Sequence, residues 1–207
     1  MNTDDEDGPQ QSAPSLPSES SAVYPVVGVG ASAGGVQALR RLCPHIRPGS
    51  GKAYVIVLHL DPDHTSDLTE IVARTSVLPV VEVRDNLPIE PDHIYVIPPN
   101  NSLTIGNGRL RLSRHAAPRA IRNTIDEFFV SLARDRGDNA ACIILSGTGS
   151  DGTLGLRAIK EAGGLTLAQA GAEYDGMMRS AVSTGLRHPA APAASHRSPR
   201  WATGSGR

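Results

Sequence analysis

The chain has 207 residues, of which 39% are apolar, 20% charged and 3% aromatic, with a formal net charge of −1. This length suits one α/β domain with an aliphatic core, and the balanced charge excludes a global electrostatic footprint for nucleic acid. No apolar run is long enough to span a bilayer, and the acidic, polar N-terminus lacks a signal-peptide pattern. Cys43 and Cys142 are too few for a disulfide framework, so we expect a cytoplasmic protein in which Cys142 is a small buried apolar residue.

Apolar strands alternate with helices after a polar N-terminal tail. Residues 1–22, rich in Ser, Pro, Gln, Asp and Glu, are predicted to be disordered. Strands are predicted over 24–29, 53–60, 79–84, 92–98, 140–145 and 165–169, and helices over 34–42, 65–76, 122–136, 153–162 and 173–184. The alternation predicts a doubly wound, mostly parallel sheet, Rossmann-like with three layers, in a single domain over 23–186. Asn107-Gly108, between alternating apolar residues, predicts a β-hairpin at one edge.

The first predicted strand leads into a glycine-rich turn that contains Ser32. The spacing Gly28-x-Gly30-x-x-Ala33 fits a loose dinucleotide-binding fingerprint. The spacing Gly30-x-Ser32-x-Gly34 fits a nucleophile elbow with Ser32 as the nucleophile. In a third interpretation, Ser32 only caps the following helix.

Polar side chains follow three predicted strands. Ser32 follows the first strand, His59 lies at the end of the second, and Asp151 follows the strand at 140–145. Because the carboxyl ends of parallel strands meet at one edge of a sheet, we expect these side chains to lie close together. There His59 would accept the proton of Ser32, Asp151 would orient the imidazole, and backbone N–H groups beside Ser32 and at 147–149 would stabilise an oxyanion. This constellation is typical of acyl transfer.

Each of these residues also has a purely structural interpretation. His59 fits a buried histidine on an apolar strand, and Asp151 before Gly152 fits a turn or N-cap aspartate. Residues 59–67 are dense in metal-ligand types, with two histidines and three aspartates. Because Pro62 interrupts this segment and no other His or Cys cluster falls at a strand end, we predict no metal and no cofactor.

Five motifs occur in a specific order and at specific spacings. They are Val-Gly-Ala-Ser-Ala-Gly-Gly at 29–35, Val-Leu-His-Leu at 57–60, Ile-Leu-Ser-Gly-Thr-Gly-Ser-Asp-Gly-Thr-Leu-Gly at 144–155, Leu-Ala-Gln at 167–169 and Gly-Met-Met-Arg-Ser-Ala at 176–181. In these motifs, and over about residues 24–186, the chain resembles the catalytic domain of chemotaxis protein-glutamate methylesterases (CheB-type).

The resemblance implies a catalytic triad of Ser32, His59 and Asp151, with oxyanion contacts at Ala33 and Thr148. It implies hydrolysis of glutamate methyl esters on chemoreceptors and deamidation of certain receptor glutamines, with release of methanol or ammonia, in chemotaxis signalling. The order Ser, His, Asp differs from the Ser, acid, His order of α/β-hydrolases and speaks against that family. The expected partner is a methylated chemoreceptor, without nucleic acid or membrane insertion.

The chain departs from the family pattern at both ends. Members commonly carry a phosphorylatable receiver domain first, whereas only 22 residues precede the domain here. Similar domains also begin longer chains fused to a CheR-type methyltransferase, a context that the acidic tail suits. Residues 187–207 are low in complexity, so we expect a truncated or frame-shifted end without packed structure.

Two alternative functions stay open at this point. A domain of the same fold could act only as a signalling or binding module, its activity lost with the C-terminal part. A dinucleotide-binding domain is the second alternative, although the acidic residue expected about 20 positions after the glycines is absent near position 50.

Overall fold

The computed structural model describes residues 24–58, 68–114, 123–183 and 201–204. The predictions for the N-terminal tail, for His59 and for the start of the helix at 65 lie outside the described residues. None of the helices in the described segments is long and apolar enough to cross a membrane.

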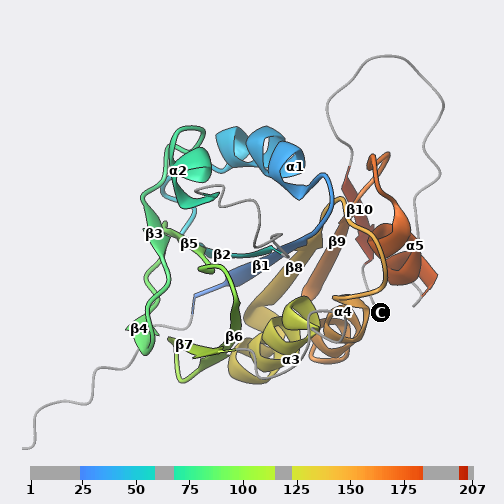
Figure 1. The fold of residues 1–207 in the computed structure, drawn as a ribbon. Coiled ribbons are helices and arrows are strands. Elements are labelled where there is room, and N and C mark those ends of the chain that lie inside the picture. The colour runs from blue at the N-terminus through green and yellow to red at the C-terminus, as the bar shows by residue number, and fades with distance from the viewer. Residues whose placement is uncertain (1–23, 59–67, 115–122, 184–200, 205–207) are drawn as a thin grey trace, which may run out of the picture.

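Seven strands form the central sheet in the order β10-β9-β8-β1-β2-β5-β3 (Figure 1). They are β1 Val26–Ala31, β2 Ala53–Leu58, β3 Val80–Glu82, β5 Ile94–Val96, β8 Ala140–Ile144, β9 Leu165–Gln169 and β10 Trp201–Gly204. All neighbouring strands pair in parallel except β10 and β9. The mostly parallel sheet predicted from the sequence is therefore confirmed.

Helices cover both faces of this sheet, which makes three layers (Figure 1). One face carries α1 Gly35–Leu42 and α2 Leu68–Ala73, and the other carries α3 Thr124–Arg136, α4 Thr153–Glu161 and α5 Gly176–Ser183. Short 3₁₀ turns occur at Cys43–His45 and Gly137–Asn139. Alternate residues of β1 serve the two faces: Val27 and Val29 pack with α1, whereas Val26 joins the core around α3. The doubly wound α/β fold is confirmed.

The predicted hairpin consists of β6 Asn101–Gly106 and β7 Arg109–Arg114. Its turn has positive φ at both central residues, 52° at Asn107 and 70° at Gly108, as a type I′ turn requires. With β4 Leu87–Pro88 the hairpin forms a separate three-stranded antiparallel sheet. This small sheet packs on α3, beside the central sheet rather than in it.

Two segments near the C-terminus differ from their predictions. Helix α5 begins at Gly176 rather than at residue 173, because the preceding residues form a loop that is hydrogen-bonded to the segment after β8. Strand β10 lies within the stretch expected to have no regular structure. Its antiparallel pairing with β9 satisfies backbone groups along that strand's outer edge, a tertiary requirement that composition does not show.

The dinucleotide interpretation of the first glycines is wrong. Gly28 and Gly30 lie inside β1, paired with both β2 and β8, and not in the turn where a pyrophosphate would bind. A Cβ at Gly28 would lie 2.7 Å from Cε1 of Phe129, and one at Gly30 would lie 2.5 Å from Cγ2 of Ile125. These glycines therefore allow α3 to pack closely against the sheet.

Candidate active site

Ser32 directly follows β1 at the carboxyl edge of the sheet and is half-buried. Its backbone N–H donates to the carbonyl of Ser146 at 3.0 Å, and its own carbonyl accepts from the N–H of Gly35 at 2.8 Å. The N-cap of α1 is Gly34, in the left-handed conformation, and no side chain caps the helix. The capping interpretation of Ser32 is therefore wrong, and its side chain is not used by the helix.

Ser146 joins three segments around this serine turn. Its buried hydroxyl donates to the carbonyl of Ala33 at 2.8 Å and accepts from the N–H of Tyr174 at 3.2 Å. Its backbone N–H donates to Oε1 of Gln169 at 3.1 Å. Because these bonds connect the ends of β1, β8 and β9, Ser146 fixes the position of the Ser32 turn relative to the neighbouring loops.

Gly147 lies directly against the serine. A Cβ at this position would lie 3.0 Å from Cβ of Ser32 and 2.1 Å from Sδ of Met177. The backbone of Gly147 donates to the carbonyl of Tyr174 at 3.0 Å and accepts from the N–H of Met177 at 3.1 Å. Only glycine fits between the serine and α5 in this arrangement.

Two backbone amides beside the serine have free donors within the described segments. Neither the N–H of Ala33 nor that of Thr148 donates to any residue that the structure describes. Ala33 follows the serine, and Thr148 follows Gly147, which contacts the serine. An oxyanion formed at Ser32 could accept hydrogen bonds from donors placed in this way.

Asp151 lies in the loop between β8 and α4, and its described contacts run to the start of α3. Its carboxylate accepts the N–H of Ile125 at 3.1 Å and the N–H of Asp126 at 2.9 Å. Asp126 in turn accepts the N–H of Gly155, in the first turn of α4, at 2.8 Å. The N-cap of α4 is Gly152, with no side-chain cap, so the interpretation of Asp151 as the N-cap of the adjacent helix is wrong; its carboxylate instead accepts N–H groups in the first turn of the distant α3.

Asp126 carries the perturbed carboxyl group of this region. Burial raises its pKa above the usual value of 3.8, the hydrogen bond from the Gly155 N–H opposes that rise, and the nearby Asp151 charge adds to it. Desolvation is the largest of these causes. Asp126 was not among the residues expected at the site, although an acidic residue in a helix's first turn is a familiar helix-start signal.

The structure places part of the predicted constellation. Ser32 and Ala33 meet the 146–148 loop at the carboxyl edge of the sheet. Asp151 lies farther along that second loop, between β8 and α4. His59 lies outside the described residues, but the residue before it, Leu58, pairs in register with Ala31, which precedes Ser32. Sequence reasoning missed Tyr174, and it quoted Ser146 and Gln169 only as parts of motifs. For Ser146 and Gln169 the available signal was a polar residue at, or just after, the end of a mostly apolar strand.

Metal ligands do not gather in the part of the chain that the structure describes, where no group of three or more His, Cys, Asp or Glu side chains could hold an ion. The acidic and histidine-rich segment 59–67 is outside that part. Both cysteines are buried free thiols, as predicted for Cys142.

Fold and site together define a three-layer α/β domain with a serine-centred turn at the carboxyl edge of its sheet. A crystal structure of the CheB methylesterase catalytic domain of Thermotoga maritima matches with a TM-score of 0.70 and 27% identity, over 78% of this chain and 89% of that one. The sequence model of the CheB methylesterase family matches residues 27–196. The chain belongs to the CheB methylesterase family, and the resemblance seen in the motifs is confirmed.

Named relatives agree with this assignment. A protein-glutamate methylesterase/protein-glutamine glutaminase of Pseudomonas aeruginosa is 36% identical over 89% of this chain and 53% of its own length. The corresponding protein of Escherichia coli K12 is 31% identical over 77% of this chain and 47% of its own length. An uncharacterised 104.1 kDa protein of Rhodobacter capsulatus is 41% identical over 58% of this chain and 13% of its own length. The chain thus spans about half the length of the two named methylesterases.

Proposed function

We propose that this domain hydrolyses methyl esters of glutamate side chains on a methylated chemoreceptor, and deamidates certain receptor glutamines. The observation that carries the proposal is the position of Ser32, in a chain of the CheB methylesterase family. Its hydroxyl is not used as a helix cap, and the amides of Ala33 and Thr148 stand unengaged among the described residues.

In the proposed reaction, Ser32 Oγ attacks the ester carbonyl while His59 takes the hydroxyl proton. Negative charge on the carbonyl oxygen is stabilised by the N–H groups of Ala33 and Thr148, each such donor contributing about 2.7–4 kcal/mol in comparable sites. His59 then protonates the departing methanol. Water, activated by the same imidazole, releases the glutamate product from Ser32.

Asp151 is the proposed orienting acid for His59. Its two hydrogen bonds from N–H groups of α3 hold the carboxylate in one place, where it is proposed to orient the imidazole and stabilise its charged form. Because this role is indirect, its loss is expected to cost less than loss of Ser32 or His59.

The first test is labelling of the 207-residue chain with a fluorophosphonate, together with measurement of methanol released from methylated receptor. We expect an adduct on Ser32, and losses of about 10⁴- to 10⁶-fold in kcat for Ser32→Ala and His59→Ala with an unchanged circular dichroism spectrum. Asp151→Asn is expected to retain more activity. Most activity surviving in Ser32→Ala would refute the triad, and a folded wild-type chain that forms no adduct would indicate a binding module instead.

Two further expectations belong to this proposal. A methylesterase acting on signalling domains of chemoreceptors would work in the cytoplasm, and a CheR-type methyltransferase would supply its substrate. Both follow from the proposed activity, and co-purification of the chain with a methylated receptor from a cytoplasmic fraction would test them.

A further inference from the structure

A polar cavity lies between α1 and the segment that follows β9, next to the serine turn. Its volume is about 150 Å³, roughly ten times what one water molecule needs. Gly34 and Ser146 both line it: Gly34 belongs to the turn of Ser32, and the hydroxyl of Ser146 donates to the carbonyl of Ala33 in that turn. The remaining lining residues are Gln37, Ala38, Arg41, Gln169, Gly171 and Glu173. A group bound here would lie next to the turn that contains Ser32, although Ser32 itself does not line the cavity.

The floor of the cavity presents a hydrogen-bond donor. Gln169 is only 5% exposed, and its Oε1 accepts the N–H of Ser146, which fixes Nε2 as the other end of the amide. Within the described segments no acceptor is bonded to Nε2. Gln169 lines the cavity, and its Nε2 is not one of the fully buried atoms without a partner, so this donor is open to the cavity and available to a ligand acceptor.

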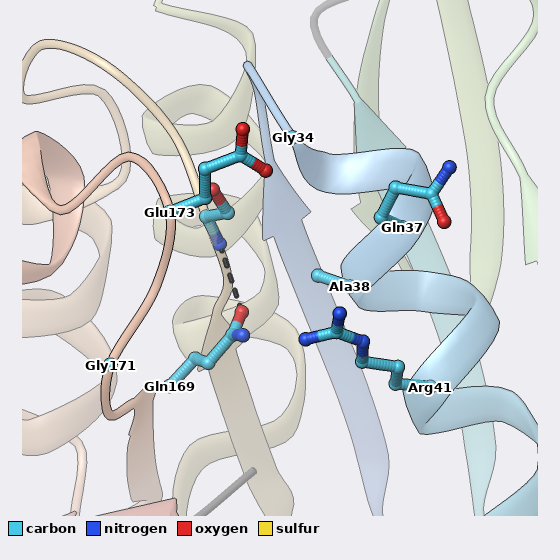
Figure 2. Close-up of a pocket in the computed structure, with 8 residues that line it drawn as sticks. Gly34, Gln37, Ala38, Arg41, Gln169, Gly171 and Glu173 are labelled. Carbon is cyan, nitrogen blue, oxygen red and sulfur yellow. Dashed lines mark hydrogen bonds between the residues drawn. The ribbon is translucent and has the colours of Figure 1, made fainter.

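Arg41 adds a positive charge on the opposite wall. Figure 2 shows its guanidinium extending from α1 toward the Gln169 side chain, whereas the Gln37 amide points away from the cavity. Arg41 pairs with no carboxylate among the described residues. Guanidinium and amide N–H groups that converge on one space match the two oxygens of a carboxylate.

Glu173 is the one acidic residue among those that line the cavity. Its carboxylate points away from Gln169, beside Gly34 at the start of α1 (Figure 2). Arg41 and Glu173 are both exposed, so solvent screens both charges, and the difference between them is the direction in which each side chain points. Because the guanidinium extends toward Gln169 and the carboxylate points away from it, the groups beside Gln169 favour an anionic ligand over a cationic one.

We infer that this cavity is a substrate subsite for the carboxylate of an Asp or Glu side chain that neighbours the esterified glutamate. This inference rests on the proposed function, because the neighbour is defined by the ester bound at Ser32. Such a subsite would let the domain select among glutamates on a receptor through binding energy remote from the reacting bond. The target ester is uncharged, so the recognition of charge must come from a neighbouring residue.

The experiment measures kcat and KM for γ-methylglutamate peptides whose flanking residues carry in turn Glu or Gln. With the 207-residue chain, Arg41→Gln is expected to raise KM about tenfold for the preferred acidic peptide, with kcat nearly constant, and to remove the preference over Gln. Arg41→Lys keeps the positive charge but lacks the planar guanidinium with its paired N–H donors, so it should raise KM by a smaller factor. Arg40→Gln, an exposed neighbour on α1 outside the cavity, is the matched control for loss of one positive charge and should leave the preference intact.

The direction of the KM change in a second variant distinguishes an anionic from a cationic ligand. Glu173→Gln should leave KM for the acidic peptide unchanged or lower, because it removes a repulsive charge. A rise in KM with Glu173→Gln, together with a preference for Lys in the flank, would overturn the inference in favour of a cationic ligand. An equal effect of Arg41→Gln and Arg40→Gln, or no effect of either, would also overturn it.

Failure of the subsite is distinguishable from failure of the proposed function. If wild-type Ser32 is labelled and methanol is released, but the acidic preference is absent, only the subsite inference fails. If wild-type protein forms no adduct and releases no methanol from any peptide, the hydrolase proposal fails and the subsite inference fails with it.

Discussion

The carboxylates of Asp126 and Asp151 connect the starts of α3 and α4. Asp151, in the loop before α4, accepts two N–H groups from the first turn of α3, and Asp126, in that same turn, accepts the N–H of Gly155 in α4. Each carboxylate thereby satisfies donors that a helix start leaves without partners, and each lies at the positive end of a helix dipole. The exchange locks the Asp151 loop to the neighbouring helix and so restricts where a residue of the proposed triad can lie.

The first prediction concerns the pH dependence of stability at Asp126. Its pKa is raised in the folded state, mainly by burial, so the folded protein binds this proton more tightly than the unfolded chain. The group therefore stabilises the fold most below the unfolded value of about 3.8, and that contribution is lost as pH rises through the folded pKa. Relative to Asp126→Asn, the wild-type free energy of unfolding should fall as pH rises from below 3.8 toward neutral.

Urea denaturation of both proteins over this pH range measures the effect. Asp126→Ala, which removes the cap altogether, should cost about 1–2 kcal/mol at neutral pH. A wild-type stability that rises with pH relative to Asp126→Asn would show that hydrogen bonding, and not desolvation, dominates the shift in pKa.

The second prediction concerns the glycines of β1. Gly30→Ala would place a methyl group 2.5 Å from Cγ2 of Ile125, and Gly28→Ala would place one 2.7 Å from the ring of Phe129. Because α3 must move outward to make room for the added methyl group, each substitution should destabilise the fold by about 1–3 kcal/mol. Gly106→Ala, with no atom within 4 Å of the new Cβ, is the control and should stay within about 0.5 kcal/mol of wild type. Thermal or urea unfolding reads out all three.

The third prediction concerns the hydroxyl of Ser146. Ser146→Ala leaves the carbonyl of Ala33 without its donor and the N–H of Tyr174 without its acceptor. Loss of these partners should cost about 1–3 kcal/mol of stability, and it should slow fluorophosphonate labelling of Ser32 because the turn is less well fixed. Ser183→Ala removes only a local bond to the carbonyl of Ser180 on the exposed side of α5 and serves as the control. Equal labelling rates in the two variants would contradict a positioning role for Ser146.

The fourth prediction concerns the thiols. Burial raises the pKa of Cys43 to about 11, and that of the fully buried Cys142 is raised still further. Because only the thiolate reacts with alkylating agents, neither cysteine should react with iodoacetamide in the native protein near neutral pH. Both should react in urea, as mass spectrometry would show. Rapid modification of Cys142 in the folded chain would mean that the β1–β8 core opens easily.

The sequence predicted the fold class because its strongest patterns are local. The apolar run of β2 and the helical spacing of Ile125, Phe128 and Phe129 each follow from burial on a sheet or a helix face, and the Asn107-Gly108 turn follows from backbone geometry. The predicted strand ends differ from the observed ones by a few residues, because hydrogen bonds to neighbouring strands determine where each strand ends. The family followed from motifs whose order and spacing are specific.

Only the tertiary structure decided what the glycines and aspartates do. Whether Gly30 serves a ligand or a helix depends on Ile125, far away along the chain, and whether Asp151 caps α4 or α3 depends on how two helix starts meet. The cavity between α1 and the β9 end has the same origin, because Arg41 and Gln169 share no sequence pattern. Local chemistry selects strands, helices and turns, whereas the roles of residues at the site come from contacts between segments that only the folded sheet brings together.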